Sequence, residues 1–404
     1  MGTTGIVSCI GLDAHRKFSQ VSVRGRDGKI MWRARLEHHD RTKLRQQLAR
    51  WPKGAPVVLE GSFGWGWLAD ELAAAGLEPH LAGSRQTADF RRTRGQAKNN
   101  RLDADLLTEL WEEKRRWWEV WLAPPEVRDR RELFRLRAGL VQIQTSVKNR
   151  LHAVLHRHGV VCELSDLFGV AGRKFLQHLV NRQDARLGAS GCATLKVHLQ
   201  HLGYLRKEIA DLTRQVRRIV ERQPIGKILV SVPGIGWVLA YTLLAEIGGL
   251  ERFQNGRKLV SYSLLAPQAQ DSGEEDPTRP PLGRHIGHMG RRTLQWAFLE
   301  AAHGAVHSGG CWREMWDRVT DKGTRNRNRG YIAVARRLCM VVFACWKRHT
   351  PYTDPRPPRI GLRCEPVGPG TGQPSRPMAV AESSVVLPEK SVGRRTGAGR
   401  PASL

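Results

Sequence analysis

The sequence predicts an α/β domain at the N-terminus, followed by long paired helices and a second, mostly helical domain. In residues 1–124, short β-branched runs alternate with helix-period segments. Heptad spacing of apolar residues dominates residues 125–224, and residues 225–349 keep a helical pattern. Residues 350–404 are dense in Pro, Gly, Ser and Arg without periodicity, so we expect a disordered basic tail.

The first domain is expected to hold a mixed sheet with helices on its faces. Residues 5–13 form an apolar run that closes on an acid. Two further strand-like runs, 19–24 and 29–35, are separated by the hairpin-turn signal Arg26-Asp27-Gly28. The remaining elements are expected as a helix at 41–51, a strand at 56–60, a helix at 64–75, a strand at 79–82 and a helix at 102–113.

Leucine, isoleucine and valine recur at heptad spacing in the middle region. These positions are Leu133, Leu136, Leu140, Ile143 and Val147, and then Leu202, Leu205, Ile209, Leu212, Val216 and Ile219. Such seams either fold back as an antiparallel hairpin or join two protomers. Because the second seam is unbroken over three heptads, we expect helix 195–220 to join protomers.

The charge balance predicts a nucleic-acid partner. The 404 residues include 66 Lys and Arg against 38 Asp and Glu, a formal net charge of +28. A compact surface with this excess calls for an anionic partner, and nucleic acid fits better than a membrane. The seven cysteines form no CxxC pair, and neither a signal-peptide pattern nor 18 consecutive apolar residues is present. We therefore expect a cytoplasmic protein without a membrane partner.

Three acids and an amide are candidates for a metal site. Asp13 and Glu60 each end an apolar run, where an acid is costly unless it is solvated, hydrogen-bonded or bound to metal. Asn100 and Asp103 share one helix face, whereas Asp105 points away. Divalent-metal nuclease sites gather such oxygen ligands from separate elements. Strand-end turn acids and a helix N-cap are the alternative interpretations.

A glycine-rich turn and a loop serine are further candidates. Val232-Pro-Gly234-Ile-Gly236 precedes an apolar helix and resembles a helix–hairpin–helix, whose turn N–H groups bind a DNA phosphate. Ser272 lies in a polar loop ahead of a basic run that contains Arg279, Arg284, His285, Arg291 and Arg292. A serine flanked by cations can be a nucleophile on phosphate, although most loop serines are turn residues.

These motifs, in this order, resemble the DEDD (RuvC-like) transposases of the IS110 insertion-sequence family. GLDAHRK, VVLEGSFGWGWLADEL and KNNRLDADLL resemble the three acidic blocks of that family. RRELFRLRAGLVQIQTSVKNRLHAVLHRHG resembles its connecting coiled coil. VPGIGWVLAYTLLAEIGGLERF, LLAPQAQDSG and GRHIGHMGRRTLQWAFLEAA resemble its C-terminal domain. The resemblance runs across roughly residues 5–350.

The resemblance implies an RNase-H-like fold in which Asp13, Glu60 and Asp103 bind Mg²⁺. It also implies that Ser272 forms a transient covalent bond to a DNA strand. The implied partners are the DNA of the element ends and target, a structured guide RNA, and further copies of the chain in dimers and tetramers. Such a protein would be bacterial and would associate with the nucleoid when acting.

The chain departs from the family pattern at two places. Asn100 stands where the family has Asp, which leaves three carboxylates instead of four. Leu264-Leu265-Ala266-Pro267 has Leu where the family has Gly. Besides a transposase, a site-specific DNA invertase of the same family and a catalytically weakened nucleic-acid-binding remnant therefore stay open.

Overall fold

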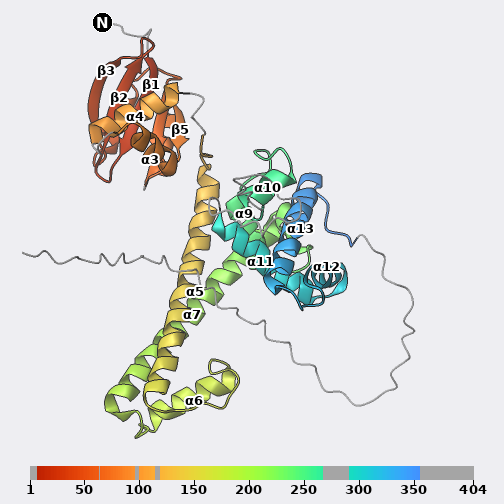
Figure 1. The fold of residues 1–404 in the computed structure, drawn as a ribbon. Coiled ribbons are helices and arrows are strands. Elements are labelled where there is room, and N and C mark those ends of the chain that lie inside the picture. Colours follow the sequence, from red (N-terminus) through yellow and green to blue (C-terminus); the bar gives the residue numbers. More distant parts are fainter. Residues whose placement is uncertain (1–6, 63, 96–99, 114–118, 267–290, 355–404) are drawn as a thin grey trace, which may run out of the picture. The chain divides into compact units, whose positions relative to one another are not determined.

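The computed structural model describes residues 7–62, 64–95, 100–113, 119–266 and 291–354. Compact packing divides the chain into two units, Met1–Asp129 and Arg130–Leu404. Each unit has cores of its own, and we describe them separately (Figure 1). The expected serine loop and residues 355–404 of the expected C-terminal tail lie outside the described residues.

The first unit is built on a five-stranded mixed sheet in the order β3-β2-β1-β4-β5. β1 pairs antiparallel with β2, and β2 with β3, through a hairpin in which Gly28 takes a φ of +77°. β4 lies parallel to both β1 and β5. The strands are β1 Val7–Ala14, β2 Phe18–Gly25, β3 Ile30–Glu37, β4 Pro56–Glu60 and β5 Glu78–Ala82.

Helices cover both faces of this sheet, as the sequence predicts. One face carries α1 (Arg41–Leu48) and α2 (Trp65–Ala74), whose leucines pack on Ile10, Leu12, Val57 and Leu59. The other carries α3 (Ser84–Thr93) and α4 (Asn100–Glu112), which form a smaller core with Val58. The α/β prediction is confirmed. Helix α3 was not expected, because its polar sequence lacks an apolar period.

The second unit contains two long helices that pack side by side (Figure 1). They are α5 (Pro125–Arg157) and α7 (Gly188–Arg222), linked through the shorter α6 (Val170–Asn181). We call residues 140–205 the helical arm. In its core, Leu202 and Leu205 of α7 are buried with Val147 and Leu151 of α5. Of the two arrangements that heptad spacing allows, the single chain adopts the folded-back hairpin.

A helical bundle completes the second unit. Its core includes Phe134 of α5 and Val216 of α7, together with apolar residues of the helices that follow. A segment around Pro233–Gly236 forms a tight turn between the first two of those helices. The helices are α8 Pro224–Val230, α9 Trp237–Ile247, α10 Gly256–Tyr262, α11 Arg292–His307, α12 Gly310–Thr320 and α13 Arg327–Arg348. Among the described helices, none is both long and apolar enough to cross a membrane.

Candidate active site

Strand register brings Asp13 and Glu60 together. Leu12 of β1 is paired with Leu59 of β4, so the next residues, Asp13 and Glu60, are neighbours where both parallel strands end. Side chains alternate between faces along a strand. Since Leu12 and Leu59 face α1 and α2, Asp13 and Glu60 point to the opposite face, which α3 and α4 cover.

Helix α4 adds Asp103 to this face, and Gly11 allows it to do so. A Cβ on Gly11 would lie 2.1 Å from the carbonyl oxygen of Ala104 and 2.9 Å from Thr108 Cγ2. Helix α4 therefore rests directly on the backbone of β1, and the contact residue Ala104 directly follows Asp103. Asp13 and Asp103 are both buried, with 9% and 7% of their surface exposed.

The electrostatics of Asp13 reflect its burial and the two other acids. Burial raises the pKa of Asp13 above its usual range, and Asp103 and Glu60 raise it further. His15 opposes this rise, because its Nε2 lies 3.1 Å from Asp13 Oδ2. Arg91 of α3 compensates Asp103, with Nε and Nη2 each 2.9 Å from Oδ1. His15 and Arg91 thus contact two of the three acids, Asp13 and Asp103.

The carboxylate oxygens of Asp13, Glu60 and Asp103 are of the kind that bind divalent cations. Carboxylate oxygens are hard ligands, and a buried Asp13 whose charged form is disfavoured by two other acids gains from a cation. Within the described residues, however, no three His, Cys, Asp or Glu side chains stand in a metal-holding arrangement. Asp103 pairs with Arg91, and Asp13 lies against His15. Asn100 is the first residue of α4, and its side chain lies outside the description.

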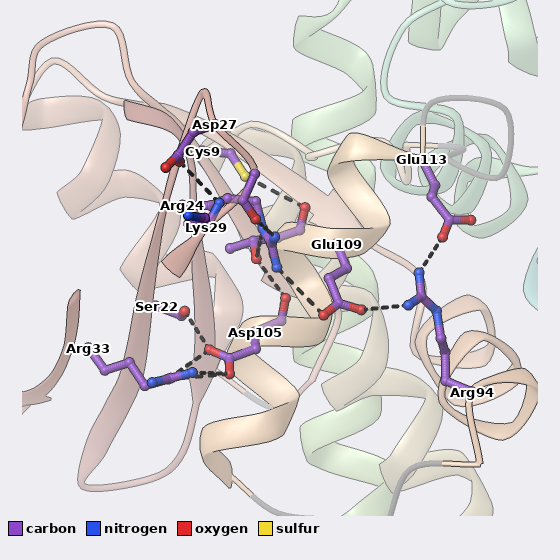
Figure 2. A network of polar contacts seen from close by, with 12 residues as sticks. Cys9, Ser22, Arg24, Asp27, Lys29, Arg33, Arg94, Asp105, Glu109 and Glu113 are labelled. Carbon is purple, nitrogen blue, oxygen red and sulfur yellow. Dashed lines mark hydrogen bonds and ion pairs between the residues drawn. The ribbon is translucent and has the colours of Figure 1, made fainter. Parts of the chain in front are cut away.

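Asp105 faces away from this cluster, as the helical spacing predicts. It accepts hydrogen bonds from Ser22 of β2 and from Arg33 of β3, the latter with Nη2 at 2.7 Å from Oδ2 (Figure 2). One turn further along α4, Glu109 pairs with Arg24 of β2 and with Arg94, which follows α3. This network fixes the rotation of α4 on the sheet, and thereby keeps Asp103 on the side of Asp13.

The glycine-rich turn lies between α8 and α9. Gly234 has a φ of +80°, and a Cβ there would lie 2.0 Å from the carbonyl oxygen of Ala301 in α11. Glycine is therefore required at position 234 for the turn to pack against α11. Gly236 is exposed, caps α9, and has open space where a side chain would stand. Arg217 of α7 lies over the ring of Trp237, the first residue of α9.

Two of the four remaining candidates lie within the described residues. Arg291 caps α11, and Arg292 is its exposed first residue. Arg291 is drawn inward, with Nη1 3.7 Å from Glu246 Oε2 and Nε donating to Tyr262 Oη at 3.0 Å. Ser272 and Arg284 lie outside the described residues.

Comparison with known families agrees with this arrangement. A model of the DEDD transposases of IS110, described as "Transposase", matches residues 10–159, which include Asp13, Glu60 and Asp103. A model described as "Transposase IS116/IS110/IS902 family" matches residues 226–317. Together the two matches cover more than half of the chain. The chain belongs to the IS110 family of transposases.

Individual relatives of the chain include insertion-sequence proteins and a gene-inverting protein. It is 28% identical to an insertion element IS110 protein of Streptomyces coelicolor over 151 residues, 37% of this chain and 36% of that one. It is 23% identical to the transposase for insertion sequence element IS1328 of Yersinia enterocolitica, over 66% of this chain and 76% of the relative. A pilin gene-inverting protein of Moraxella bovis is 26% identical over 36% of this chain and 45% of its own length. The chain thus matches about a third of the first relative's length.

The structure adds residues to the site that the motifs did not single out. His15 follows Asp13 by two positions, in a turn closed by its backbone N–H donating to Phe18 O. Arg91 belongs to the basic run Arg91-Arg92-Thr93-Arg94, which resembles a solvated charge cluster. Only the fold distinguishes Arg91, which contacts Asp103, from Arg92, which is exposed and pairs with Asp89.

Proposed function

We propose that the chain is a DNA transposase that cuts and rejoins the strands of an insertion sequence. The observation that carries this proposal is the convergence of Asp13, Glu60 and Asp103 from β1, β4 and α4, in a chain of the IS110 family. The strand order β3-β2-β1-β4-β5, with β1 central and an acid at its end, supports an RNase-H-like fold for the first unit. Its site of action is the bacterial nucleoid, in the cytoplasm.

In this proposal the carboxylates hold the metal, and other residues hold the DNA. Asp13, Glu60 and Asp103 would bind a divalent ion, proposed to be Mg²⁺, with Asn100 adding an amide oxygen as the fourth ligand. When bound, the ion supplies charge stabilisation at the scissile phosphate. Arg91, which pairs with Asp103 in this structure, would contact a phosphate oxygen of the DNA if Asp103 held the ion instead.

Ser272 is proposed as the nucleophile, on the resemblance of its loop to that of the family. Its Oγ would bond to phosphorus while the bond from phosphorus to the leaving DNA oxygen breaks. The hydroxyl proton passes to that leaving oxygen through solvent or a basic group. The phosphoester so formed conserves the bond energy, because a DNA hydroxyl reverses the same exchange when the strands are rejoined.

Nucleic-acid binding follows from charge and from the α9 turn. The net charge of +28 supports contacts to both DNA and a structured guide RNA. Gly236, at the accessible N-terminus of α9, offers backbone N–H groups to a phosphate. We assign Arg291 and Arg292 to the same proposed interface, together with Arg284, which lies outside the described residues.

We place the proposed contact between protomers on the outward side of the helical arm and its extension. Leu136 and Ile143 of α5 lie one heptad apart, and each is 52% exposed. Val197 and Tyr204 of α7 are also one heptad apart, with 46% and 63% exposed. These apolar positions are available for a dimer or tetramer, whereas Leu202 and Leu205 already have partners in their own chain.

Covalent trapping on DNA tests the proposal. The purified chain, with Mg²⁺ and RNA transcribed from its genomic flank, should form denaturation-resistant adducts with DNA that carries the element's ends. Ser272→Ala should abolish these adducts and leave DNA binding within about twofold, because one hydroxyl hardly alters the electrostatic footprint. Asp13→Ala should also abolish them. Adducts that persist in Ser272→Ala would refute the nucleophile assignment.

Asn100→Asp separates a working enzyme from a weakened one. Restoring a fourth carboxylate should raise adduct formation. If the natural chain forms no adduct but Asn100→Asp does, the chain is a weakened remnant with an intact scaffold. If Asn100→Asp lowers the activity of a working enzyme, Asn100 is a tuned ligand or a helix cap.

A DNA invertase is the second candidate. The similarity to the Moraxella bovis protein, whose name describes it as gene-inverting, favours it. Both candidates would use the same residues, so only the DNA product separates them. Excision of a circular element supports a transposase, whereas reversal of a segment between inverted sites supports an invertase.

A further inference from the structure

A surface hollow lies in the first unit, beside the carboxylate site. It is formed where the chain links β1 to β2 and where it leaves β3, and we call it the hairpin hollow. Its volume is about 440 Å³, which falls within the range of pockets that bind small ligands. The residues that line it are Arg16, Lys17, Glu37, His38 and His39.

The walls of the hairpin hollow are held by defined contacts. The backbone N–H of His38 donates to Lys17 O at 2.9 Å, which ties the link between β1 and β2 to the end of β3. The His38 ring has its Nε2 2.8 Å from Ser19 Oγ, and it stands edge-on to the Trp67 ring with 4.9 Å between their centres. The hairpin hollow is therefore a fixed feature of this end of the sheet.

Two positive charges of the hairpin hollow have no partner. Arg16 and Lys17 are exposed, and within the described residues neither side chain takes part in a hydrogen bond, ion pair or ring contact. The carboxylate of Glu37 is compensated, because Arg35 Nε donates to its Oε1 at 2.6 Å. Burial lowers the pKa of His38, so its ring adds no positive charge at pH 7. The lining therefore favours an anion.

Strand register places the hairpin hollow next to the acids. Asp13 of β1 is paired with Gln20 of β2, and Gln20 is paired with Arg35 of β3, so the three side chains form one row on the same face of the sheet. Glu37 lies two residues beyond Arg35 on β3. From a rise of about 3.4 Å per residue and about 4.8 Å between strands, the Cα atoms of Asp13 and Glu37 are roughly 12 Å apart. One nucleic-acid strand can therefore reach both places.

The surface between the acids and the hairpin hollow suits a nucleic acid. His15, which contacts Asp13, has its ring centre 4.8 Å from that of Phe18, and the Arg35 guanidinium lies over the same Phe18 ring at 3.7 Å. The Arg35 side chain is 56% exposed. Aromatic rings and guanidinium groups are the side chains along which a nucleic-acid strand packs. Cationic and aromatic groups thus continue from the acids to the hairpin hollow.

We propose that Arg16 and Lys17 hold, in the hairpin hollow, one phosphate group of the DNA strand that is cut at the carboxylate site. The Arg16 guanidinium can bind two phosphate oxygens at once, and the Lys17 ammonium adds a second charge. Such a contact reads no base, but it fixes the register of the strand over Asp13. The assignment to the cut strand rests on the proposed function. The phosphate site itself rests on the hairpin hollow and its two cations without partners.

The salt dependence of DNA binding tests the phosphate contact. The full chain with Ser272→Ala binds duplex DNA that carries the element's ends, and fluorescence anisotropy follows the affinity between about 50 and 200 mM salt. Adding Arg16→Gln and Lys17→Gln should reduce the slope of log affinity against log salt by about 0.9, the value for one phosphate. The affinity of this variant should therefore fall about 3.5-fold less over that range than the affinity of its parent.

Arg26→Gln with Lys29→Gln is the matched control. These two residues are exposed, flank the turn at the opposite end of the β2–β3 hairpin, and have no side-chain partner within the described residues. The control removes the same charge from the same sheet, so it should keep the slope of its parent. Equal slopes in the two double variants would show that Arg16 and Lys17 are solvated charges, and would overturn the phosphate site.

An uncharged phosphate analogue locates the contact on the DNA. Single phosphates of the cut strand are replaced in turn by methylphosphonate around the cleavage point. At one position the replacement should weaken binding by the parent and by the control, but should have no effect on the Arg16→Gln, Lys17→Gln variant, because the two changes remove the same interaction. If no position shows this coupling, the assignment to the cut strand is wrong.

Two further outcomes separate this inference from the proposed function. A slope that falls for structured RNA but not for DNA would overturn the assignment to DNA. Failed adduct trapping together with a coupled methylphosphonate position would refute the transposase proposal and support the phosphate site. Normal adduct trapping without a coupled position would do the reverse.

Discussion

Replacing Gly11 by alanine should damage both the stability of the first unit and its carboxylate site. The added Cβ would lie 2.1 Å from the carbonyl oxygen of Ala104, where ordinary contact begins near 3.4 Å. Backbone atoms on both sides cannot rotate away, so α4 must retreat from β1 by roughly 1 Å. Overpacking of this kind costs about 1–3 kcal/mol.

This cost is measurable in the intact protein. For a unit the size of Met1–Asp129, a loss of about 2 kcal/mol lowers the unfolding temperature by roughly 5–10 °C. The retreat also takes Asp103 away from Asp13, so divalent-ion binding and adduct formation should both weaken. Calorimetry and the trapping assay measure the two effects on the same samples.

Gly203→Ala is the matched control for this substitution. Gly203 lies inside α7, is exposed, and has no atom within 4 Å of an added Cβ. Alanine should stabilise the helix there by about 0.5–1 kcal/mol. If Gly11→Ala unfolds at the wild-type temperature and binds metal normally, then α4 does not depend on the close contact, and our account of how Asp103 is positioned is wrong.

Three further substitutions test the site and the arm. Folding raises the pKa of Asp13, so the wild type loses stability as the pH rises from 3.8 through the raised value and the buried carboxyl group ionises. In a metal chelator at neutral pH, Asp13→Asn should therefore be more stable than the wild type. Denaturant titrations should show this difference vanish below about pH 3.8. Arg91→Gln should bind Mg²⁺ more tightly than the wild type in calorimetry, because the cation that competes for Asp103 is gone. Arg92→Gln, at an exposed neighbouring position, should bind Mg²⁺ as the wild type does. Equal affinities of Arg91→Gln and the wild type would exclude Arg91 from the site. The double variant Leu136→Lys, Ile143→Lys should lower the oligomer mass in light scattering and retain its helicity, because both positions are exposed. Leu202→Lys should reduce helicity, because it places a charge in the core of the helical arm. An unchanged mass of the double variant would exclude Leu136 and Ile143 from the contact between protomers.

The sequence by itself determined the sheet and two of its acids. Apolar runs of strand length end at Asp13 and Glu60, and this local pattern marks both acids as candidates. That they are neighbours depends on the parallel pairing of β1 with β4. The spacing of Asp103 and Asp105 on α4 likewise fixed which acid turns toward the site. Both inferences needed only the period of a strand or a helix.

Only the tertiary structure decided which partners these side chains take. The heptads of α5 and α7 are equally compatible with pairing inside one chain and between chains, and burial of Leu202 in the helical arm selects the first. Arg91 and Arg291 resemble their exposed neighbours in the sequence. They contact Asp103 and Tyr262 because consecutive described helices, α3 with α4 and α10 with α11, pack against each other, and a local pattern carries no record of that packing.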